Sequence, residues 1–487
     1  MNTNQTLRIS LQENIKTIKK LLPAEDVLSY DFTTADGTDC VLFYVDGMVN
    51  KELLGTLVAR PLTRLIAQEK GGRVATSVGE TVLFPELKRV EKTADMIKEV
   101  LDGNTLLLVD GLSCGWVAGA KLLPVRAIAE PPSDVAIKGP REGFIEDIKT
   151  NMALVRKRLK TPDLRFETLR VGKRSQTAVS ICYLEGTSNA EVLAELKARI
   201  EKIEVDVVPD SSYIATLVSP RPHSLFKSLG TTEKPDVFTA KIAEGRVGVL
   251  VDGSPIALTA PFVLTEDLQS SEDYFNSPFT ATVFRFLRLA SLLVAILLPA
   301  FYVSAQLYKM QLLPLGLMLT IASSVRELPL SPALEMFVVL FLFETLKEAS
   351  IRMPKYVGMS LSVVGALVLG EAAVSAGFLS TPTIIIVASS GICLYTVPDF
   401  VETGSILRWL FLLVSGSLGP FGIILLTAFL LAYLLTSDRF GTPALAPFSP
   451  LSGRDLRDSV VKYGMRSLAV RPRILRSPNR TRLTKTI

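Results

Sequence analysis

The chain has 487 residues, with 53 Lys and Arg, 48 Asp and Glu, and a formal net charge of +5. It has one histidine, His223, in a proline-rich loop, and neither a P-loop nor the glycine fingerprint of a dinucleotide fold, which excludes the common nucleotide-dependent enzymes. Its four cysteines are scattered without a CxxC pair, which excludes a disulfide framework and a zinc site. We therefore expect a protein that is not an enzyme and holds no metal and no cofactor.

Charged residues are distributed very unevenly along the chain. Only 13 of the 149 residues from Leu289 to Ser437 are Asp, Glu, Lys or Arg. A soluble core does not require this asymmetry, whereas a bilayer does. The sequence therefore predicts a water-soluble α/β region over residues 1–285, an α-helical, polytopic membrane domain over residues 286–437, and a basic tail over residues 438–487.

The start of the chain, residues 1–30, is polar and charged, and we expect it to form a helical segment. No apolar run near Met1 resembles a signal peptide, so the soluble region is expected to stay in the cytoplasm. That compartment is reducing, and the cysteines are then expected to be buried thiols.

The rest of the soluble region reads as two copies of one α/β subdomain. The first covers residues 31–135, and residues 136–285 contain a linking helix and the second copy. The strand-like segments Cys40–Gly47 and Val179–Gly186 are each followed by a helical pattern, and they lie 139 positions apart. Repetition at a fixed offset indicates an old duplication.

The closing halves of the two copies also repeat. They begin at Glu91 and Glu233, an offset of 142, and each reads as a helix followed by a strand that ends in Asp-Gly. Asp-Gly supplies the positive φ angles of a tight hairpin turn. This turn role explains Asp46, Asp110 and Asp252 better than metal binding or acid/base chemistry does.

A helix is predicted between the copies, over Gly139–Lys160. Pro140 suits its first turn, and acidic residues lie early and basic residues late, which complements the helix dipole. One apolar face is expected to pack against the sheet of a subdomain or against a neighbouring protomer. That face consists of Phe144, Ile148, Val155 and Leu159.

The membrane domain contains five apolar runs that are candidate spans. They are Leu289–Tyr308, Pro332–Phe343, Tyr356–Gly377, Pro382–Tyr395 and Trp409–Ser437. The shorter run Met310–Val325 contains Pro314 and is expected to be re-entrant or interfacial. If the soluble region and the tail share one side, the number of crossings is even, and a break at Ser415–Pro420 can fold the last run back. We expect four to six spans.

The tail has 11 Lys or Arg against 3 acidic residues, directly after the last apolar run. No aromatic residues interleave with the arginines at its Arg-rich end, so nucleic-acid binding is the weaker explanation. The positive-inside rule places the tail on the cytoplasmic side, near anionic lipid.

Ionisable residues inside the apolar half are candidate ion-binding or gating groups, because a charge there normally faces water or a partner. Glu344, Glu348 and Arg352 are spaced four apart and form one polar stripe on a helix. Glu348 can pair with Arg352, and Glu344 can reach Lys347. Alternatively, the stripe is an interfacial helix end that Pro354 stops.

Glu371 lies deep in an otherwise uncharged run without a partner nearby in the sequence. It is the first candidate for an ion-interacting or gating carboxylate, and the alternative is a buried, hydrogen-bonded glutamic acid. Glu335, in the second apolar run, is a further candidate. Small residues along the span of Glu371 permit close helix packing or widen a pore. They are Gly365, Gly370, Ala373 and Gly377.

Several motifs occur in a fixed order between about residues 30 and 430. They are Gly139–Phe144 with Thr150-Asn151 and Arg156–Arg158, Thr232–Asp236, Val251–Gly253, Ser271–Tyr274, Phe343–Pro354 and Val364–Ala373. Together they resemble the A subunits of the GerA family of spore germination receptors. Asn151 and Arg156 of these motifs join Phe144 and Ile148 as candidate residues of an assembly helix.

The resemblance implies a membrane subunit of the spore inner membrane that oligomerises, as a pentamer, into a ligand-gated channel for monovalent cations. It also implies a permease-like B subunit that binds the nutrient and a lipoprotein C subunit as partners. A sporulation-encoded paralogue shares the same motifs. Two other functions stay open: a secondary transporter, suggested by the broken last run, and a non-conducting scaffold or signal relay.

Overall fold

The computed structural model describes residues 7–34, 37–63, 78–122 except 80 and 83, 138–326, 328–464 and 467–482. Contacts divide the chain into two compact units. Unit 1 comprises Met1–Val263, Arg439–Thr442 and Met465–Ile487, and unit 2 comprises Leu264–Asp438 and Pro443–Gly464. The predicted boundary between residues 135 and 136 lies outside the described residues.

Unit 1 contains two antiparallel five-stranded sheets. The first has the strand order β1-β2-β4-β5-β3 and the second the order β6-β7-β9-β10-β8, so equivalent strands occupy equivalent places. The strands of the first sheet are β1 (Val27–Thr33), β2 (Asp39–Val45), β3 (Leu87–Val90), β4 (Thr105–Val109) and β5 (Gly115–Ala118). Those of the second are β6 (Leu164–Val171), β7 (Thr177–Leu184), β8 (Gly230–Thr232), β9 (Val247–Val251) and β10 (Ala257–Ala260).

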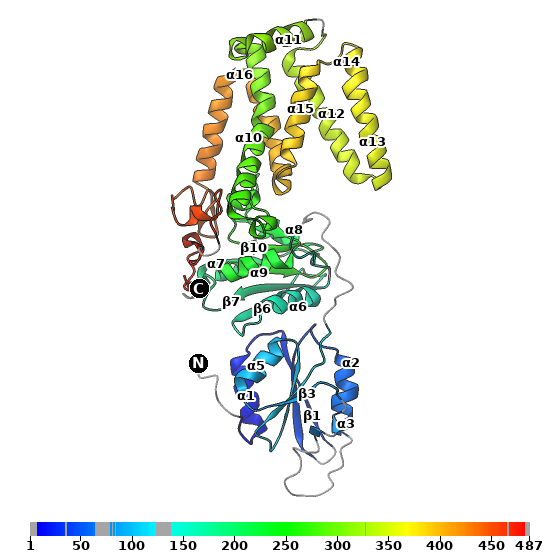
Figure 1. Ribbon diagram of the computed structural model, residues 1–487, viewed down its shortest axis with the longest axis vertical. Coiled ribbons are helices and arrows are strands. Elements are labelled where there is room, and N and C mark those ends of the chain that lie inside the picture. Colours follow the sequence, from blue (N-terminus) through cyan, green and yellow to red (C-terminus); the bar gives the residue numbers. More distant parts are fainter. Residues whose placement is uncertain are drawn as a thin grey trace. The chain divides into compact units, whose positions relative to one another are not determined.

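Each sheet is covered by helices on both faces (Figure 1). In the first module these are α1 (Leu11–Leu21) and α5 (Thr93–Leu101) on one face, with α2 (Lys51–Leu54), a π-helical turn over Gly55–Ala59 and α3 (Arg60–Thr63) on the other. In the second module they are α6 (Ile148–Arg158) and α9 (Pro235–Glu244), with α7 (Ala190–Glu201) and α8 (Ser211–Val218) opposite. Alternate residues of β2 show why: Val41 and Phe43 join one core and Leu42 the other.

The Asp-Gly turns do more than reverse the chain. Gly111 and Gly253 have φ angles of 82°, as a tight turn after β4 and after β9 requires. The aspartate before each glycine also caps a helix from another part of its module. Asp110 Oδ1 accepts the Leu11 backbone N–H at 2.9 Å, and Asp252 Oδ1 accepts the Ile148 N–H at 3.3 Å.

Helices α1 and α6 therefore occupy equivalent positions in the two modules. Asn14 bonds the backbone N–H and carbonyl of Arg8, and Asn151 bonds those of Ile145, in each case six residues upstream. Asn14 and Asn151 are 137 positions apart. Helix α6 is thus the first helix of the second module, and it is not a separate connection. The common strand order is as a duplication predicts; common ancestry stays a prediction.

Both predicted helices at the module starts are shorter in the structure. The predicted Gly139–Lys160 helix begins only at Ile148, because Asp147 caps it by accepting the Thr150 N–H at 2.8 Å, and Asn151 holds the preceding loop outside the helix. The predicted helical segment 1–30 forms α1 over Leu11–Leu21 and gives way to β1, since Pro23 disfavours a helix before it.

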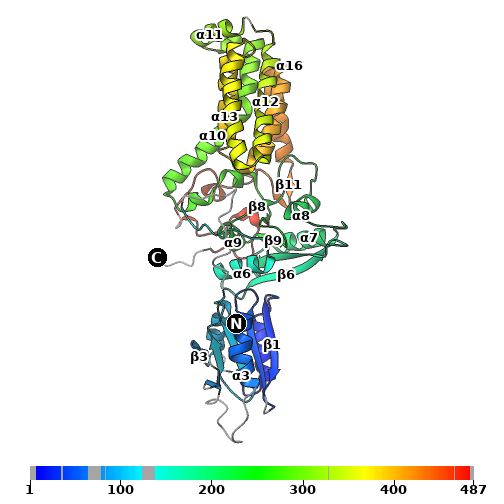
Figure 2. The same cartoon turned by 90° about the vertical axis from the view of Figure 1, so that its right-hand side faces the viewer.

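Unit 2 is built from apolar helices (Figures 1 and 2). They are α10 (Pro278–Tyr308), α11 (Leu315–Val325), α12 (Pro332–Arg352), α13 (Lys355–Leu367), a π-helical turn (Val368–Ala372), α14 (Ala373–Ser375), α15 (Thr381–Leu394) and α16 (Val401–Leu435). By length and composition, two of the described helices are long and apolar enough to cross a membrane: Pro278–Tyr308 and Pro398–Leu435. Helix α11 lies across the end of the bundle in both views.

Helix α16 folds back at Gly419, as predicted for the break at Ser415–Pro420. Gly419 has φ 64° and ψ −146°, outside the helical region, and Pro420 follows it. Across the break, a side chain at Gly422 would come within 2.7 Å of the Val414 carbonyl. Eight residues of straight helix span about 12 Å, so the chain reverses its direction at this break.

The predicted basic tail is folded over its described residues and does not extend freely. Residues 443–464 belong to unit 2, where Asp458 accepts a hydrogen bond from the fully buried Arg285 of α10 at 3.1 Å. Asp273 also pairs with Arg285, at 2.9 Å. Burial raises the pKa of Asp273, but hydrogen bonds from Arg288 and Arg285 outweigh it and leave the pKa below its usual value.

The two modules of unit 1 are joined by acids of the first module and by bases in α6 and just after it. Arg156 donates to both carboxylate oxygens of Asp26, at 2.8 and 2.7 Å, and both side chains are buried. On either side of this pair, Lys149 contacts Asp46 at 3.1 Å, and Lys160 bonds Asp102. Arg156 is also held by the carbonyls of its own module at residues 161 and 164.

Replacing Asp26 with Asn is expected to lower the free energy of unfolding of unit 1 by about 3–5 kcal/mol, because Arg156 stays buried without a counter-charge. Urea denaturation of the full chain in detergent, followed by Trp116 fluorescence in a Trp409→Phe background, measures this. Asp31→Asn is the control, since Asp31 is exposed on β1. Equal midpoints for the two variants would contradict the role of the pair.

Acidification is also expected to weaken the joint between the modules. Burial raises the pKa of Asp46, but Lys51 and Lys149 outweigh it, and Lys121 and Lys160 lower the pKa of Asp102. Both folded-state values lie below the ordinary 3.8, so the stabilisation is complete above that pH and is lost as the pH falls through the folded values. The urea midpoint should therefore drop steeply below about pH 4.

The matched variant for this pH test is the double substitution Lys149→Met and Lys160→Met. It is expected to lower the midpoint at pH 7 and to flatten the dependence between pH 5 and pH 3. An unchanged pH profile would show that these two pairs contribute little to the joint, as exposed ion pairs often do.

Candidate functional site: charges buried among the apolar helices

A buried charge network joins four helices of unit 2. Arg408 of α16 is 1% exposed; its guanidinium bonds Glu344 of α12 and lies 3.0 Å from Ser390 Oγ of α15. Ser390 Oγ donates to the Ala295 carbonyl of α10 at 2.6 Å. Lys347 Nζ completes the network 2.6 Å from Glu344. Within these apolar helices Glu344 therefore has two positively charged partners, Arg408 and Lys347.

The predicted polar stripe on α12 separates into a buried and an exposed part. Glu344 pairs with Lys347, as its spacing predicted, but it turns inward to Arg408. Glu348 and Arg352 form the other predicted pair at 2.6 Å, with side chains 57% and 77% exposed. An exposed pair of this spacing contributes only about 0.3–0.5 kcal/mol. Glu344 is thus the residue of the stripe that organises the interior.

Glu371 lies in the π-helical turn between α13 and α14 and is exposed. Among the described residues it has no hydrogen-bond or ion-pair partner. Single-turn π segments inside α-helices frequently occur at functional sites. The alternative of a buried, hydrogen-bonded glutamic acid does not hold within one chain.

The four small residues near Glu371 play different parts. A side chain at Gly365 would come within 2.8 Å of Leu346 Cδ1, so this glycine permits close packing of α13 on α12. At Gly370 and Gly377 the added atom would meet nothing within 4 Å, and Gly377 has a φ of 69° that ends the helical segment. Ala373 is partly buried against the core of unit 2.

Glu335 is fully buried near the start of α12. Its Oε1 accepts hydrogen bonds from the backbone N–H of Ser380 at 2.6 Å and from Ser380 Oγ at 2.7 Å. The carboxylate therefore caps α15 from a neighbouring helix. It does not share the network of Glu344.

Residues of the predicted assembly helix are buried within their own chain. Phe144 packs edge-on against Phe238 at 5.6 Å, and both belong to the core between the second sheet and α6 with Ile148. Asn151 and Arg156 are buried by the contacts described above. Of the two predicted packings, against a sheet or against a protomer, the structure has the first.

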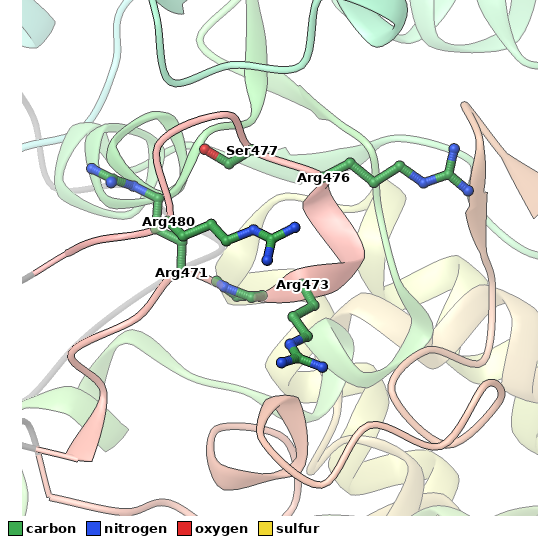
Figure 3. Close-up of a pocket in the computed structure, with 6 residues that line it drawn as sticks. Arg471, Arg473, Arg476, Ser477 and Arg480 are labelled. Carbon is green, nitrogen blue, oxygen red and sulfur yellow. The ribbon is translucent and has the colours of Figure 1, made fainter.

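The tail contains a pocket lined by arginines (Figure 3). Its lining residues are Arg471, Pro472, Arg473, Arg476, Ser477 and Arg480. The side chains of Arg473 and Arg476 extend away from each other, so they do not converge on one anion. Ser477 Oγ donates to the Thr187 carbonyl at 2.5 Å, which ties the segment to the second module.

Sequence reasoning missed Arg408 and Ser390. Arg408 directly precedes the predicted span Trp409–Ser437, and an isolated arginine beside an apolar run was the available signal. Nothing in the sequence indicated that Ser390 contacts other helices, because a hydroxyl in an apolar run usually bonds its own helix. Within the described part of the chain, no group of three or more His, Cys, Asp or Glu side chains could hold a metal ion.

Comparison with known proteins identifies relatives over nearly the whole chain. The family model described as Bacillus/Clostridium GerA spore germination protein matches residues 13–474. The uncharacterized membrane protein YfkQ of Bacillus subtilis (strain 168) is 33% identical over 97% of this chain and 92% of its own. Spore germination protein B1 of the same organism is 31% identical, with coverage of 95% and 96%. Spore germination protein GerLA of Bacillus cereus is 32% identical, with coverage of 91% of both chains.

The chain also aligns with a solved structure. It is the N-terminal domain of the A subunit of the Bacillus megaterium spore germinant receptor GerK3, with a TM-score of 0.43 and 23% identity. The alignment covers 54% of this chain and 99% of that one.

Replacing Glu344 with Gln is expected to destabilise unit 2 by about 3–5 kcal/mol, because Arg408 then stays buried with no negative partner. Denaturant titration in detergent, followed by fluorescence of the adjacent Trp409 in a Trp116→Phe background, measures the change. The control is Glu348→Gln on the same helix, which removes an exposed pair and should cost less than about 1 kcal/mol. Similar costs for both variants would refute the distinction between the two glutamates.

Proposed function

This chain belongs to the GerA family of Bacillus/Clostridium spore germination proteins, and from this we propose that it is a membrane subunit of a spore germinant receptor. In this proposal it oligomerises, as a pentamer, into a ligand-gated channel for monovalent cations whose opening starts germination. In this proposal the protein assembles into a ligand-gated channel that conducts cations, and it does not catalyse a reaction.

The apolar helices support a place in the membrane. Helices α10 and α16 are long and apolar enough to span a membrane. One relative, YfkQ, is named as a membrane protein. Large apolar side chains are more than half exposed along both helices, including Phe301, Leu293, Phe421 and Phe429. Exposed apolar surface of this kind needs lipid or a partner to cover it.

The fold-back of α16 supports the topology that we propose within the membrane. With α10, α12, α13–α14, α15 and the two halves of α16 as separate crossings, the number is even. The soluble region and the tail then share one side, which we propose to be the cytoplasmic side of the spore inner membrane. The proposed partners are a permease-like B subunit and a lipoprotein C subunit, in keeping with the family.

Glu371 is the observation that carries the channel proposal. It sits on a π-helical turn in the apolar unit, exposed and without a partner among the described residues. A carboxylate in a bilayer is costly unless it meets water or an opposite charge. In an oligomer, the surface that carries Glu371 can line a shared, water-filled path, where the carboxylate attracts cations. Glu344 does not serve this purpose, because Arg408 and Lys347 already neutralise it.

Conduction can be tested with the assembled protein in liposomes. The wild-type chain is expected to pass K⁺ or Na⁺, and Glu371→Gln should lower the cation flux severalfold by removing a charge from the path. Glu348→Gln is the matched control, an exposed glutamate of α12 whose loss should leave the flux unchanged. Impermeable liposomes would contradict a channel, and saturable substrate uptake without channel-like flux would identify a transporter.

The same variants can be compared in spores that lack the gene. Supplying the wild-type chain should restore cation release, and supplying Glu371→Gln should restore assembly but not normal release. Full release with Glu371→Gln, Glu344→Gln and Arg352→Gln would instead support a non-conducting scaffold or signal relay.

A further inference from the structure

A second buried polar cluster lies where α10 ends and where α12 and α15 begin (Figure 1). It contains one carboxylate and four neutral polar side chains, and we call it the Glu335 cluster. Its members are Tyr302, Gln306, Glu335, Ser380 and Thr383. The Tyr302 hydroxyl lies close to Thr383, Ser380 and Gln306, and the Glu335 carboxylate is near enough to interact with it electrostatically.

Only one of the two carboxylate oxygens of Glu335 has a hydrogen-bond partner among the described residues. Oε1 receives both hydrogen bonds from Ser380, but Oε2 is buried and has no hydrogen-bond partner within the described part of the chain. The Tyr302 hydroxyl and both amide atoms of Gln306 are also buried, and they make no hydrogen bond of ordinary geometry among the described residues, although the hydroxyl lies close to Thr383, Ser380 and Gln306. Glu335 is 0% and Tyr302 6% exposed. Unpartnered buried polar atoms cost stability, so their gathering at one place points to a missing ligand.

The charge of the cluster identifies the class of ligand. Ser380 Oγ and N–H sit at the start of α15, and Glu335 lies in the first turn of α12, so the positive ends of two helix dipoles lie beside this carboxylate. No cationic side chain among the described residues pairs with Glu335, in contrast with Glu344 on the same helix. One uncompensated negative charge surrounded by neutral oxygens is balanced by one positive charge.

We propose that the Glu335 cluster binds one monovalent metal cation, K⁺ or Na⁺. The ligands are Glu335 Oε2, the Tyr302 hydroxyl and Gln306 Oε1, with the hydroxyl of Thr383 close by. Hard cations prefer such carboxylate, carbonyl and hydroxyl oxygens, whereas a divalent ion typically draws on more than one carboxylate or on phosphate. Gln306 also lies in the last turn of α10, whose negative dipole end favours a cation.

A bound ion would tie the end of α10 to the starts of α12 and α15. In linking this ion to the permeating one, the inference rests on the proposed channel function. The binding itself is argued from the charge balance of the site, and it can be measured without conduction.

The test uses thermal unfolding of the full chain in a non-ionic detergent at constant ionic strength, with choline chloride replaced stepwise by KCl or NaCl. Trp409 is a local reporter, because its ring packs 4.8 Å from that of Phe337, two positions from Glu335. A Trp116→Phe background leaves it as the single tryptophan of the two in the chain. K⁺ or Na⁺ should raise the midpoint of the Trp409 transition by about 3 °C or more over choline.

Glu335→Gln should abolish this cation-specific shift, and Glu348→Gln, which removes an exposed charge from the same helix, should retain it. Tyr302→Phe keeps the charge and the ring but removes one oxygen ligand, so it should raise the half-saturating cation concentration at least about fivefold. This neutral variant keeps the proposal testable if Glu335→Gln fails to fold.

Equal midpoints in choline, K⁺ and Na⁺ for the wild-type background would overturn the proposal and assign the cluster to trapped water or to a protonated Glu335. A shift that persists in Glu335→Gln would overturn it as well. A chain that binds the cation but does not conduct in liposomes keeps this inference and contradicts the proposed channel. A chain that conducts but shows no cation-specific stabilisation contradicts this inference and keeps the proposed channel.

Discussion

The cost of taking a charge out of water shapes this chain, and the three largest fully buried side chains of its described part are all arginines. Arg156 meets Asp26, 130 positions away, and so joins the two modules of unit 1. Arg285 meets Asp273 and Asp458, the latter 173 positions away, which holds part of the tail against α10. Arg408 meets Glu344 of α12. Each pair fixes which distant segments lie together, because leaving one partner alone in the interior is costly.

Such pairs determine which segments lie together more than they raise the free energy of unfolding. Replacing a whole buried pair with apolar residues is often neutral, whereas removing one member is strongly destabilising. The hydrophobic cores alone would tolerate many relative positions of the two modules. A bidentate Arg156–Asp26 pair tolerates very few, since both oxygens of the carboxylate are used at once. The Lys149 and Lys160 pairs beside it are exposed and add mainly pH and salt dependence.

Local patterns predicted much of the fold, and distant contacts explain the rest. The Asp-Gly turns, the strands before them and the break at Gly419 depend on neighbouring residues, so the sequence located them. The start of α6 depends on Asp147, Asn151 and a cap from Asp252, more than 100 positions away, so the prediction placed it too early. Arg408 and Glu344 are 64 positions apart, and no local pattern joins them. The partner of Glu335, Ser380, is likewise supplied by another helix.

Glu335 and Glu371 are residues of the same type in opposite surroundings, one buried within its own chain and the other exposed on the surface of unit 2. Glu335 is enclosed by helices of its own chain, so whatever neutralises it must reach a site that one subunit completes. Glu371 is exposed on the surface of the same unit, so its surroundings in a membrane come from lipid, water or a neighbouring subunit. The proposed assembly would therefore change the environment of Glu371 far more than that of Glu335. In the proposed receptor, a response of subunit contacts to the nutrient would reach Glu371 directly, and it would reach Glu335 only through the helix ends that meet at its site.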